Sequence, residues 1–205
     1  MRPRSTLVAL AVGCALPLGA VPRAYVVDPG SSSVQVHVGK SGVFGFAGHE
    51  HDVVAQRVAG TVEADPDDLA RSTVALTFEA SGLRVVAEGE PAGDAPKVQE
   101  VMSGPKVLDA ARFPSITFRS RTVTGRRVAD GVYELQVAGE LSLHGVARPV
   151  TVPVRVEVSG ATLTATGRTV VAQRAFGIQP VSAGGGTVKV KNEVDVTFRI
   201  VARAN

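Results

Sequence analysis

The sequence has no tryptophan, only two tyrosines and a single cysteine, and each scarcity excludes something. One cysteine, Cys14, cannot form an internal disulfide, so the fold must rest on a hydrophobic core. With 205 residues, of which 44% are hydrophobic, the chain is long enough to bury such a core within one domain. The few aromatic residues also offer little surface for stacking nucleic-acid bases.

Several motifs of catalysis and ligand binding are absent as well. There is no Gly-x-Ser-x-Gly nucleophile elbow, and the run Gly184–Gly186 is not followed by Lys-Ser/Thr at phosphate-loop spacing. The lysines and arginines of the predicted strands alternate with acidic residues instead of forming a basic stripe, which argues against a nucleic-acid partner. Asp65, Asp67 and Asp68 lack the glycine and distal glutamate of an EF-hand, so they are read as a solvated turn.

The N-terminal residues 1–24 have the layout of a secretory signal peptide. Residues 1–4 are basic, Leu7 to Leu18 form an apolar run without charge, and small residues follow. The run is too short to span a bilayer. We therefore expect a signal peptide over 1–24, a single domain over 25–205 and an exported protein, periplasmic or extracellular, with no stable transmembrane span after processing.

Three points about this leader stay open at the sequence level. Cleavage after Ala20 or after Ala24 fits about equally, since neither site has an ideal small-x-small pattern. An uncleaved N-terminal anchor is an alternative. Ala11-Val12-Gly13-Cys14 also loosely resembles a lipoprotein box, so a lipid anchor through Cys14 is the minority reading.

The basic character of the chain belongs largely to the same leader. The formal net charge is +3 and the pI is about 9.3. Arg2, Arg4 and Arg23 lie before Tyr25, and that segment contains no acidic residue. Without these three arginines, 19 of the 22 basic residues remain against 19 acidic ones. The mature domain is then close to neutral, and the charge gives no argument for an anionic partner.

Beyond Tyr25 the main signal is alternation of apolar and polar residues with period two, which predicts strands with one buried face. Turn signals such as Asp28-Pro29-Gly30 and Asp130-Gly131 separate the runs. A helix is predicted for Ala95–Ser103, with Pro96 in its first turn and Gly104 at its end. The predicted strands are 25–27, 33–38, 58–63, 73–80, 115–120, 133–143, 150–158, 162–171 and 188–200.

This pattern predicts an all-β fold, an antiparallel β-barrel of about eight strands with one short helical insert. Several runs exceed the usual strand length, and closure would remove their long exposed edges. A two-sheet sandwich is the alternative. Composition alone does not decide whether the interior of such a barrel is packed or holds a ligand.

One cluster suggests a different chemistry. In Gly48-His49-Glu50-His51-Asp52, an extended backbone would place His49 and His51 on the same side, as a metal site requires. His144 ends the strand 133–143 and would join them only if the fold brings these ends together. Local hydrogen bonding of neutral imidazoles is the competing interpretation, and His37 is read as an exposed histidine.

Four strings along the chain resemble the YceI-like family. They are Tyr25-Val26-Val27-Asp28-Pro29-Gly30-Ser31-Ser32-Ser33, Val107-Leu108-Asp109-Ala110-Ala111-Arg112-Phe113-Pro114-Ser115-Ile116-Thr117-Phe118-Arg119-Ser120, Gly139-Glu140-Leu141-Ser142-Leu143-His144-Gly145-Val146-Ala147-Arg148-Pro149-Val150 and Phe176-Gly177-Ile178. They follow the order of the family and cover nearly the whole mature chain.

The resemblance implies an extended lipocalin-like barrel whose apolar interior holds a long isoprenoid, such as a polyisoprenoid or a quinone-type lipid. It implies no catalysis and no cofactor besides the bound lipid, and a homodimer is compatible with it. If the segment 42–52 borders the barrel mouth, its histidines would contact a polar head group. The residues expected to contact the lipid are Phe46, Phe78, Phe118, Leu135, Val137, Leu141, Phe176 and Ile178.

Two other functions remain as alternatives. One is a metal-binding protein or metal-dependent enzyme that uses His49 and His51, with His144 as a weaker candidate. The other is a surface or stress-response binding module without a ligand in the barrel. Sequence leaves open the chain length and head group of a lipid ligand.

Overall fold

The computed structural model describes residues 22–41, 50–183 and 188–205. Within these residues, one α-helix, α1 (Asp94–Ser103), and three short 3-10 helices, η2 (Leu69–Arg71), η3 (Ala80–Gly82) and η4 (Gln173–Phe176), accompany the strands. The strands are β1 (Arg23–Val27), β2 (Ser33–Val38), β3 (Lys40–Ser41), β4 (His51–Ala55), β5 (Val58–Ala64), β6 (Thr73–Glu79), β7 (Leu83–Val85), β8 (Ser115–Ala129), β9 (Val132–Leu143), β10 (Val146–Ser159), β11 (Thr162–Ala172), β12 (Ser182–Ala183), β13 (Val188–Val190) and β14 (Glu193–Ala204).

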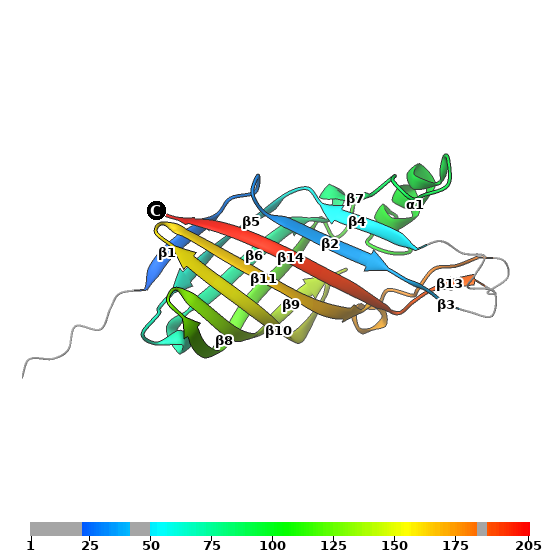
Figure 1. Cartoon of the computed structure of the whole chain (residues 1–205). Coiled ribbons are helices and arrows are strands. Elements are labelled where there is room, and N and C mark those ends of the chain that lie inside the picture. Colours follow the sequence, from blue (N-terminus) through cyan, green and yellow to red (C-terminus); the bar gives the residue numbers. More distant parts are fainter. Residues whose placement is uncertain (1–21, 42–49, 184–187) are drawn as a thin grey trace, which may run out of the picture.

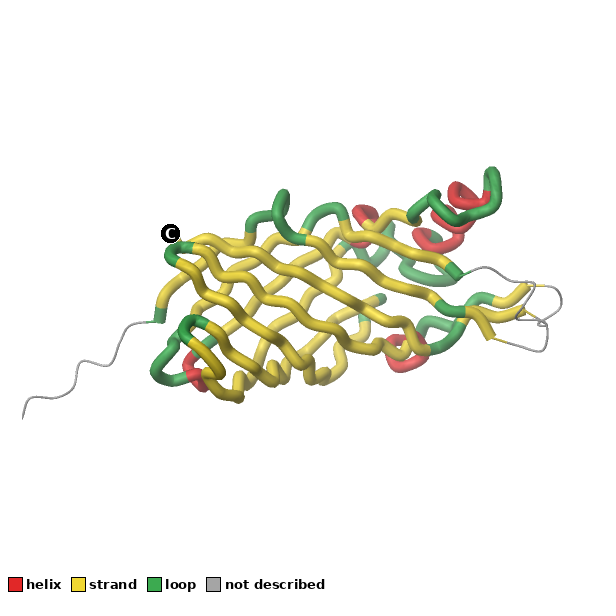
Figure 2. Tube along the Cα trace, viewed as in Figure 1, coloured by secondary structure: helices red, strands yellow, loops and turns green. Residues whose placement is uncertain are grey.

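Eight of these strands form a closed antiparallel barrel. Their order is β1-β5-β6-β8-β9-β10-β11-β14, and β14 closes the ring by pairing with β1, with Tyr25 opposite Ala204. Figures 1 and 2 show the resulting elongated cylinder, with the C-terminus at one end and the small sheet β12-β13-β3 beyond the other. The all-β barrel prediction is confirmed, and the sandwich alternative is wrong because the hydrogen-bonded ring is complete.

The strand β14 has two partners on the same side. Its C-terminal part pairs with β1, whereas its N-terminal part pairs with β2, from Asp195 opposite His37 to Arg199 opposite Ser33. The sheet then continues through β4 to β7, and α1 packs beside β7. There the Gln99 side chain takes the place of a further strand beside β7. It donates to the Leu83 carbonyl (3.1 Å) and accepts from the Val85 N–H (2.9 Å).

These pairings give the barrel two different ends. At one end, called here the β1 end, lie the start of β1, the β5–β6 turn, the β8–β9 turn and the β10–β11 turn. At the other end, called here the mouth, lie the start of β4, the α1 segment, the β9–β10 turn and η4. Within the described ranges, none of the helices has the length and hydrophobicity of a membrane span.

The predicted periodicity is found in the barrel wall, with some differences at element ends. The helix prediction for Ala95–Ser103 is confirmed by α1. The predicted strand 188–200 is two strands, because the Asn192 side-chain carbonyl accepts the Arg174 N–H (3.0 Å) and the chain turns there. The strands β4 and β7 were not predicted, since five and three residues carry too little alternation.

Candidate ligand cavity

The barrel encloses a cavity of about 740 Å³ that runs along its interior. Its wall is built from the apolar positions of the alternating strands, so the period-two pattern of the sequence becomes an aliphatic surface. On β10 every second residue from Val150 to Val158 lines it, and on β14 the lining residues are Val194, Val196, Phe198 and Ile200. On β1, β2, β4, β5 and β6 the lining residues include Tyr25, Val34, Val36, Val38, Val53, Ala55, Val62, Val74 and Leu76.

Most of the residues predicted to contact a lipid lie on this wall. Phe78 and Phe118 face the cavity from neighbouring strands, Leu135, Val137 and Leu141 from β9, and Ile178 from the segment after η4. The structure thus brings six of the eight predicted residues around one space.

The other two predicted residues are placed differently. Phe176 is not among the residues that line the cavity, and it packs instead against Val171, Ile178 and Val194. Phe176 ends the 3-10 helix η4, and the period-two alternation of strands does not predict which side chains of a helix face the cavity. Phe46 lies outside the described residues.

The β1 end of the cavity is polar. Asp65 is the buried acidic residue there, with 1% exposure, and its Oδ1 accepts the N–H groups of Asp67 and Asp68, each at 3.0 Å. Its Oδ2 lies 3.4 Å from the Arg71 Nε. Arg23, Arg127 and Asp130 also border this end. Sequence reasoning read Asp65 as solvated, because a turn of three acidic residues gives no sign of burial.

The three described histidines have three different hydrogen-bond partners. His51 begins β4, and its Nδ1 lies 2.6 Å from Oε1 of Glu90. His144 lies in the β9–β10 turn, where its Nδ1 is 3.3 Å from the Phe176 carbonyl oxygen. His37 is half-exposed, as expected, with Nδ1 2.8 Å from the Asp52 carboxylate.

These contacts give the metal interpretation no support. Among the described residues, no group of three or more His, Cys, Asp or Glu side chains is arranged to hold a metal ion. His51 and His144 each bond to protein groups instead of to a shared point, and His49 lies outside the described residues. The carboxylate partner of His51 comes from 39 residues further along the chain, so no local motif indicated it.

Comparison with known proteins agrees with this architecture. Among curated proteins, a UPF0312 protein of Vibrio parahaemolyticus is 28% identical over 148 residues, which is 70% of this chain and 68% of the relative. Among solved structures, Burkholderia cenocepacia BcnA has a TM-score of 0.65 at 24% identity, covering 85% of this chain and 98% of BcnA.

A second solved structure is a polyisoprenoid binding domain from Saccharophagus degradans, with a TM-score of 0.62 and 13% identity over 89% of this chain and 99% of that domain. At these identities the structural matches establish the fold. The sequence itself also matches the YceI-like domain over residues 25–202, nearly the whole described barrel. The chain belongs to the YceI-like family.

Proposed function

We propose that this protein is an exported binding protein that carries or sequesters an amphiphilic isoprenoid, with the apolar tail inside the barrel. The observation that carries the proposal is the cavity of about 740 Å³ with an aliphatic wall. Its volume falls in the range typical of small-molecule sites, roughly 300–1,000 Å³. The polyisoprenoid binding domain of Saccharophagus degradans, which shares the fold, supports an isoprenoid as the ligand class.

The shape of the wall favours an extended chain over a compact molecule. The lining residues of β10 run from Val150 to Val158, about 26 Å along the strand at roughly 3.3 Å per residue. Each buried methylene of a ligand would contribute about 0.8 kcal/mol before ordering costs. We propose binding without catalysis, because the middle of this wall offers aliphatic and aromatic side chains and no paired nucleophile and base.

The proposal is tested by mass spectrometry of an organic extract of protein purified from its native host. A matched pair of variants on β11 shows whether the lipid occupies the cavity. Ala165 lines the cavity, so Ala165→Trp fills it. Val170, on the same strand, is 54% exposed, so Val170→Trp adds the same side chain outside.

We expect a co-purified lipid with a long apolar chain in the wild type and in the Val170→Trp variant. The Ala165→Trp variant should lose most of it while remaining folded by circular dichroism. Repeated absence of lipid from the wild type, or equal lipid in both variants, would contradict the proposed site.

A further inference from the structure

The wall of the barrel contains an interval near the mouth that no strand pairing closes. β6 pairs with β8 as far as Glu79 opposite Ser115, whereas β7, which follows β6 after η3, pairs with β4 alone. The Ala80 N–H still donates to the Pro114 carbonyl (2.9 Å). Beyond that bond, no backbone hydrogen bond between described residues joins β7 to the chain that leads into β8.

Residues 87–113, called here the insert, fill this interval. They include α1, which lies on the outside of the barrel beside β7 (Figure 1). Three side chains of the insert, Met102, Val107 and Leu108, line the cavity. Leu108 is 9% exposed and belongs to the same hydrophobic cluster as Val53 of β4. The insert is therefore part of the cavity wall.

The backbone of the insert is bonded to itself and not to the barrel. Within the part of the chain that the structure describes, every backbone-to-backbone hydrogen bond of residues 87–113 has both partners inside the insert. An example is the Asp109 N–H, which donates to the Gly104 carbonyl at 2.8 Å. The strands of the wall are instead joined by ladders of backbone bonds. The insert can therefore move as a unit without breaking a backbone bond of the barrel.

Side chains hold the insert against the barrel. Gln99 lies along the edge of β7 that has no strand partner, where it donates to the Leu83 carbonyl (3.1 Å) and accepts from the Val85 N–H (2.9 Å). Glu90 lies closer to the start of the insert, and its Oε1 is 2.6 Å from the His51 Nδ1 on β4. Each of these contacts can break while the strand ladders stay intact.

The two ends of the insert differ in how they are fixed. Gly89 and Gly93 have positive φ, 88° and 82°, and a side chain at either position would meet nothing within 4 Å. Glycines in such open surroundings change their backbone conformation at little steric cost. At the other end, the Phe113 ring lies edge-on to the His144 ring, with centroids 5.0 Å apart. The insert thus has a hinge before α1 and an anchor where β8 begins.

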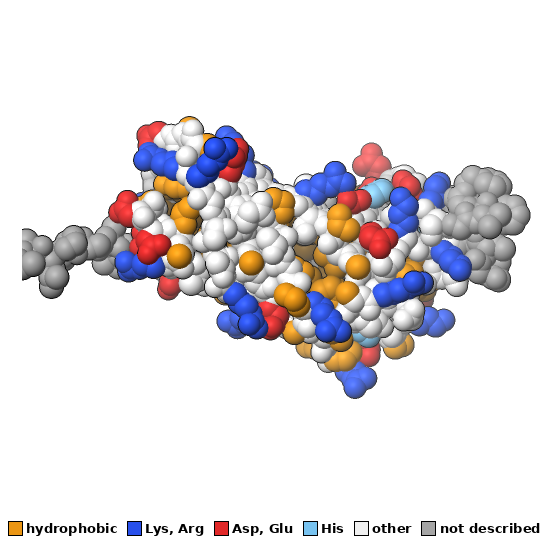
Figure 3. All heavy atoms as spheres, turned by 90° about the horizontal axis from the view of Figure 1, so that it is seen from below, with side chains coloured by type: hydrophobic (Ala, Val, Ile, Leu, Met, Phe, Trp, Pro, Cys, Tyr) orange, Lys and Arg blue, Asp and Glu red, His pale blue; other side chains and the backbone are white. Residues whose placement is uncertain are grey.

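We propose that the insert is a lateral gate, which swings away from the edge of β7, lets the apolar chain of the ligand pass between β7 and β8, and closes over it. This inference rests on the proposed function, because it concerns how the ligand reaches the same cavity. The competing route is end-on through the mouth. Figure 3 shows hydrophobic side chains gathered in a hollow on the half of the molecule nearer the small sheet, where that route would begin.

Binding kinetics with all-trans-retinol, an isoprenoid alcohol that absorbs tyrosine emission, distinguish the two routes. The sequence has two tyrosines and no tryptophan, and Tyr25 and Tyr133 both line the cavity. Energy transfer from tyrosine therefore reports on retinol inside the barrel. Gln99→Ala removes the contacts to β7. Gln136→Ala is the matched control, because Gln136 is exposed on β9 and is not among the residues that line the cavity.

We expect Gln99→Ala to raise the association and dissociation rate constants of retinol by the same factor, about threefold to tenfold, and to leave Kd unchanged. The reason is that a weaker closed state increases the open fraction equally with and without ligand. Gln136→Ala should bind retinol as the wild type does. Hydrogen exchange of the amides in 87–113 should also become faster in Gln99→Ala, whereas exchange in β9 and β10 should stay the same.

A crosslink makes the opposite change at the same place. In the variant Cys14→Ser/Arg84→Cys/Gln99→Cys, a short bifunctional thiol reagent joins β7 to α1, and Cys14 is replaced because it is the single cysteine of the sequence. Before crosslinking, this variant should exchange retinol as fast as Gln99→Ala. Crosslinking should slow both rate constants by about tenfold or more without changing Kd. Circular dichroism and thermal unfolding verify that the variant is folded.

Other outcomes separate the failures. Rate constants that neither Gln99→Ala nor the crosslink changes would overturn the gate, assign entry to the mouth and leave the carrier function standing. A lower affinity that arises from dissociation alone would also overturn the gate, because the insert would then be a fixed part of the wall. Unchanged hydrogen exchange of the insert in Gln99→Ala would overturn it without any ligand. Failure of the wild type to bind retinol would instead contradict the carrier function, and the gate with it.

Discussion

His51 and Glu90 form a nearly buried pair that joins the start of β4 to the loop between β7 and α1. The Nδ1 of His51 lies 2.6 Å from Oε1 of Glu90, whose side chain is 3% exposed, and Oε2 has no hydrogen-bond partner. His51 shares the strand parity of Val53 and Ala55, which line the cavity. The pair therefore fastens the α1 segment at the interior side of the mouth.

We expect His51→Ala to destabilise the protein by about 2 kcal/mol, because it leaves the Glu90 carboxylate buried without its partner. Glu90→Gln should cost less. The double variant His51→Ala/Glu90→Gln should be more stable than His51→Ala alone, since the unpaired charge is gone. Urea unfolding at constant m-value measures this, and strictly additive effects would show that the two side chains are not coupled.

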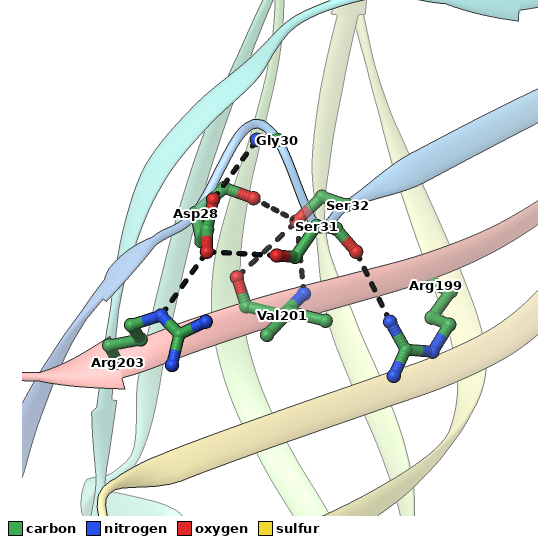
Figure 4. A network of polar contacts seen from close by, with 7 residues as sticks. All are labelled: Asp28, Gly30, Ser31, Ser32, Arg199, Val201 and Arg203. Carbon is green, nitrogen blue, oxygen red and sulfur yellow. Dashed lines mark hydrogen bonds and ion pairs between the residues drawn. The ribbon is translucent and has the colours of Figure 1, made fainter.

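Asp28 and Arg203 fasten the side wall of the barrel at the point where β1 and β2 part along β14 (Figure 4). The carboxylate of Asp28 accepts from the Ser31 hydroxyl (2.9 Å), the Gly30 N–H (3.0 Å) and the Arg203 Nε (3.2 Å). The Asp28 N–H donates to the Val201 carbonyl at 2.8 Å. Ser32 bonds to the same β14 residue, as its Oγ accepts the Val201 N–H at 3.0 Å.

These bonds, first the Ser31 hydroxyl and then Arg203, hold the pKa of the Asp28 carboxyl below its ordinary value of 3.8. The unfolded chain therefore takes up the proton at a higher pH than the folded one, and the stability contributed by Asp28 is lost as the pH falls below about 3.8. We expect Asp28→Asn to lower stability at neutral pH and to flatten the acid side of the stability profile.

Chemical unfolding between pH 2.5 and 6 measures this change. Glu88→Gln is the control, because Glu88 is exposed and its side chain makes no hydrogen bond or ion pair with a described residue. An unchanged acid slope in Asp28→Asn would show that the network does not stabilise the ionised form.

Period-two alternation predicted the barrel wall well because each strand is buried on one face only. Val150 to Val158 could be assigned to the interior from sequence, since neighbouring polar residues fixed the parity. Phe176 could not, because it follows the end of a strand. Contacts such as His51 with Glu90, and Arg148 with the Ala175 carbonyl, join segments that are distant in sequence, so only the topology brings them together.

The amino-acid composition also could not predict whether the barrel interior is packed or holds a cavity. Gly167 and Phe198 show why, since they lie opposite each other on β11 and β14, and the ring of Phe198 covers the glycine. A side chain at Gly167 would meet the Phe198 Cζ at 2.5 Å and the Pro153 carbonyl oxygen at 2.6 Å. The space left inside the barrel depends on such local pairings.

We therefore expect Gly167→Ala to destabilise the barrel by about 1–3 kcal/mol, since the Pro153 backbone cannot move aside as a side chain would. It should also displace Phe198, which lines the cavity, and reduce lipid content. Gly82→Ala is the control, because the nearest atom there is at an ordinary 3.4 Å. Thermal unfolding of both variants and lipid mass spectrometry check this, and equal melting temperatures would contradict it.

The pairing of β1 helps to decide between the two expected cleavage sites, after Ala20 and after Ala24. Arg23 pairs with Ala64 and Ala24 with Glu63, and the Arg23 guanidinium donates to the Gly160 carbonyl at 3.0 Å. Cleavage after Ala24 would remove both pairs and leave Glu63 and Ala64 of β5 without their β1 partners, whereas cleavage after Ala20 keeps β1 whole. If the leader is removed on the proposed export, we therefore predict that the processed protein begins at Val21, and intact-mass measurement of the protein purified from its native host tests this. A mass corresponding to a start at Tyr25 would contradict this prediction and show that the barrel closes without these contacts. In that case, Arg23→Ala in the precursor should leave the stability of the processed protein unchanged.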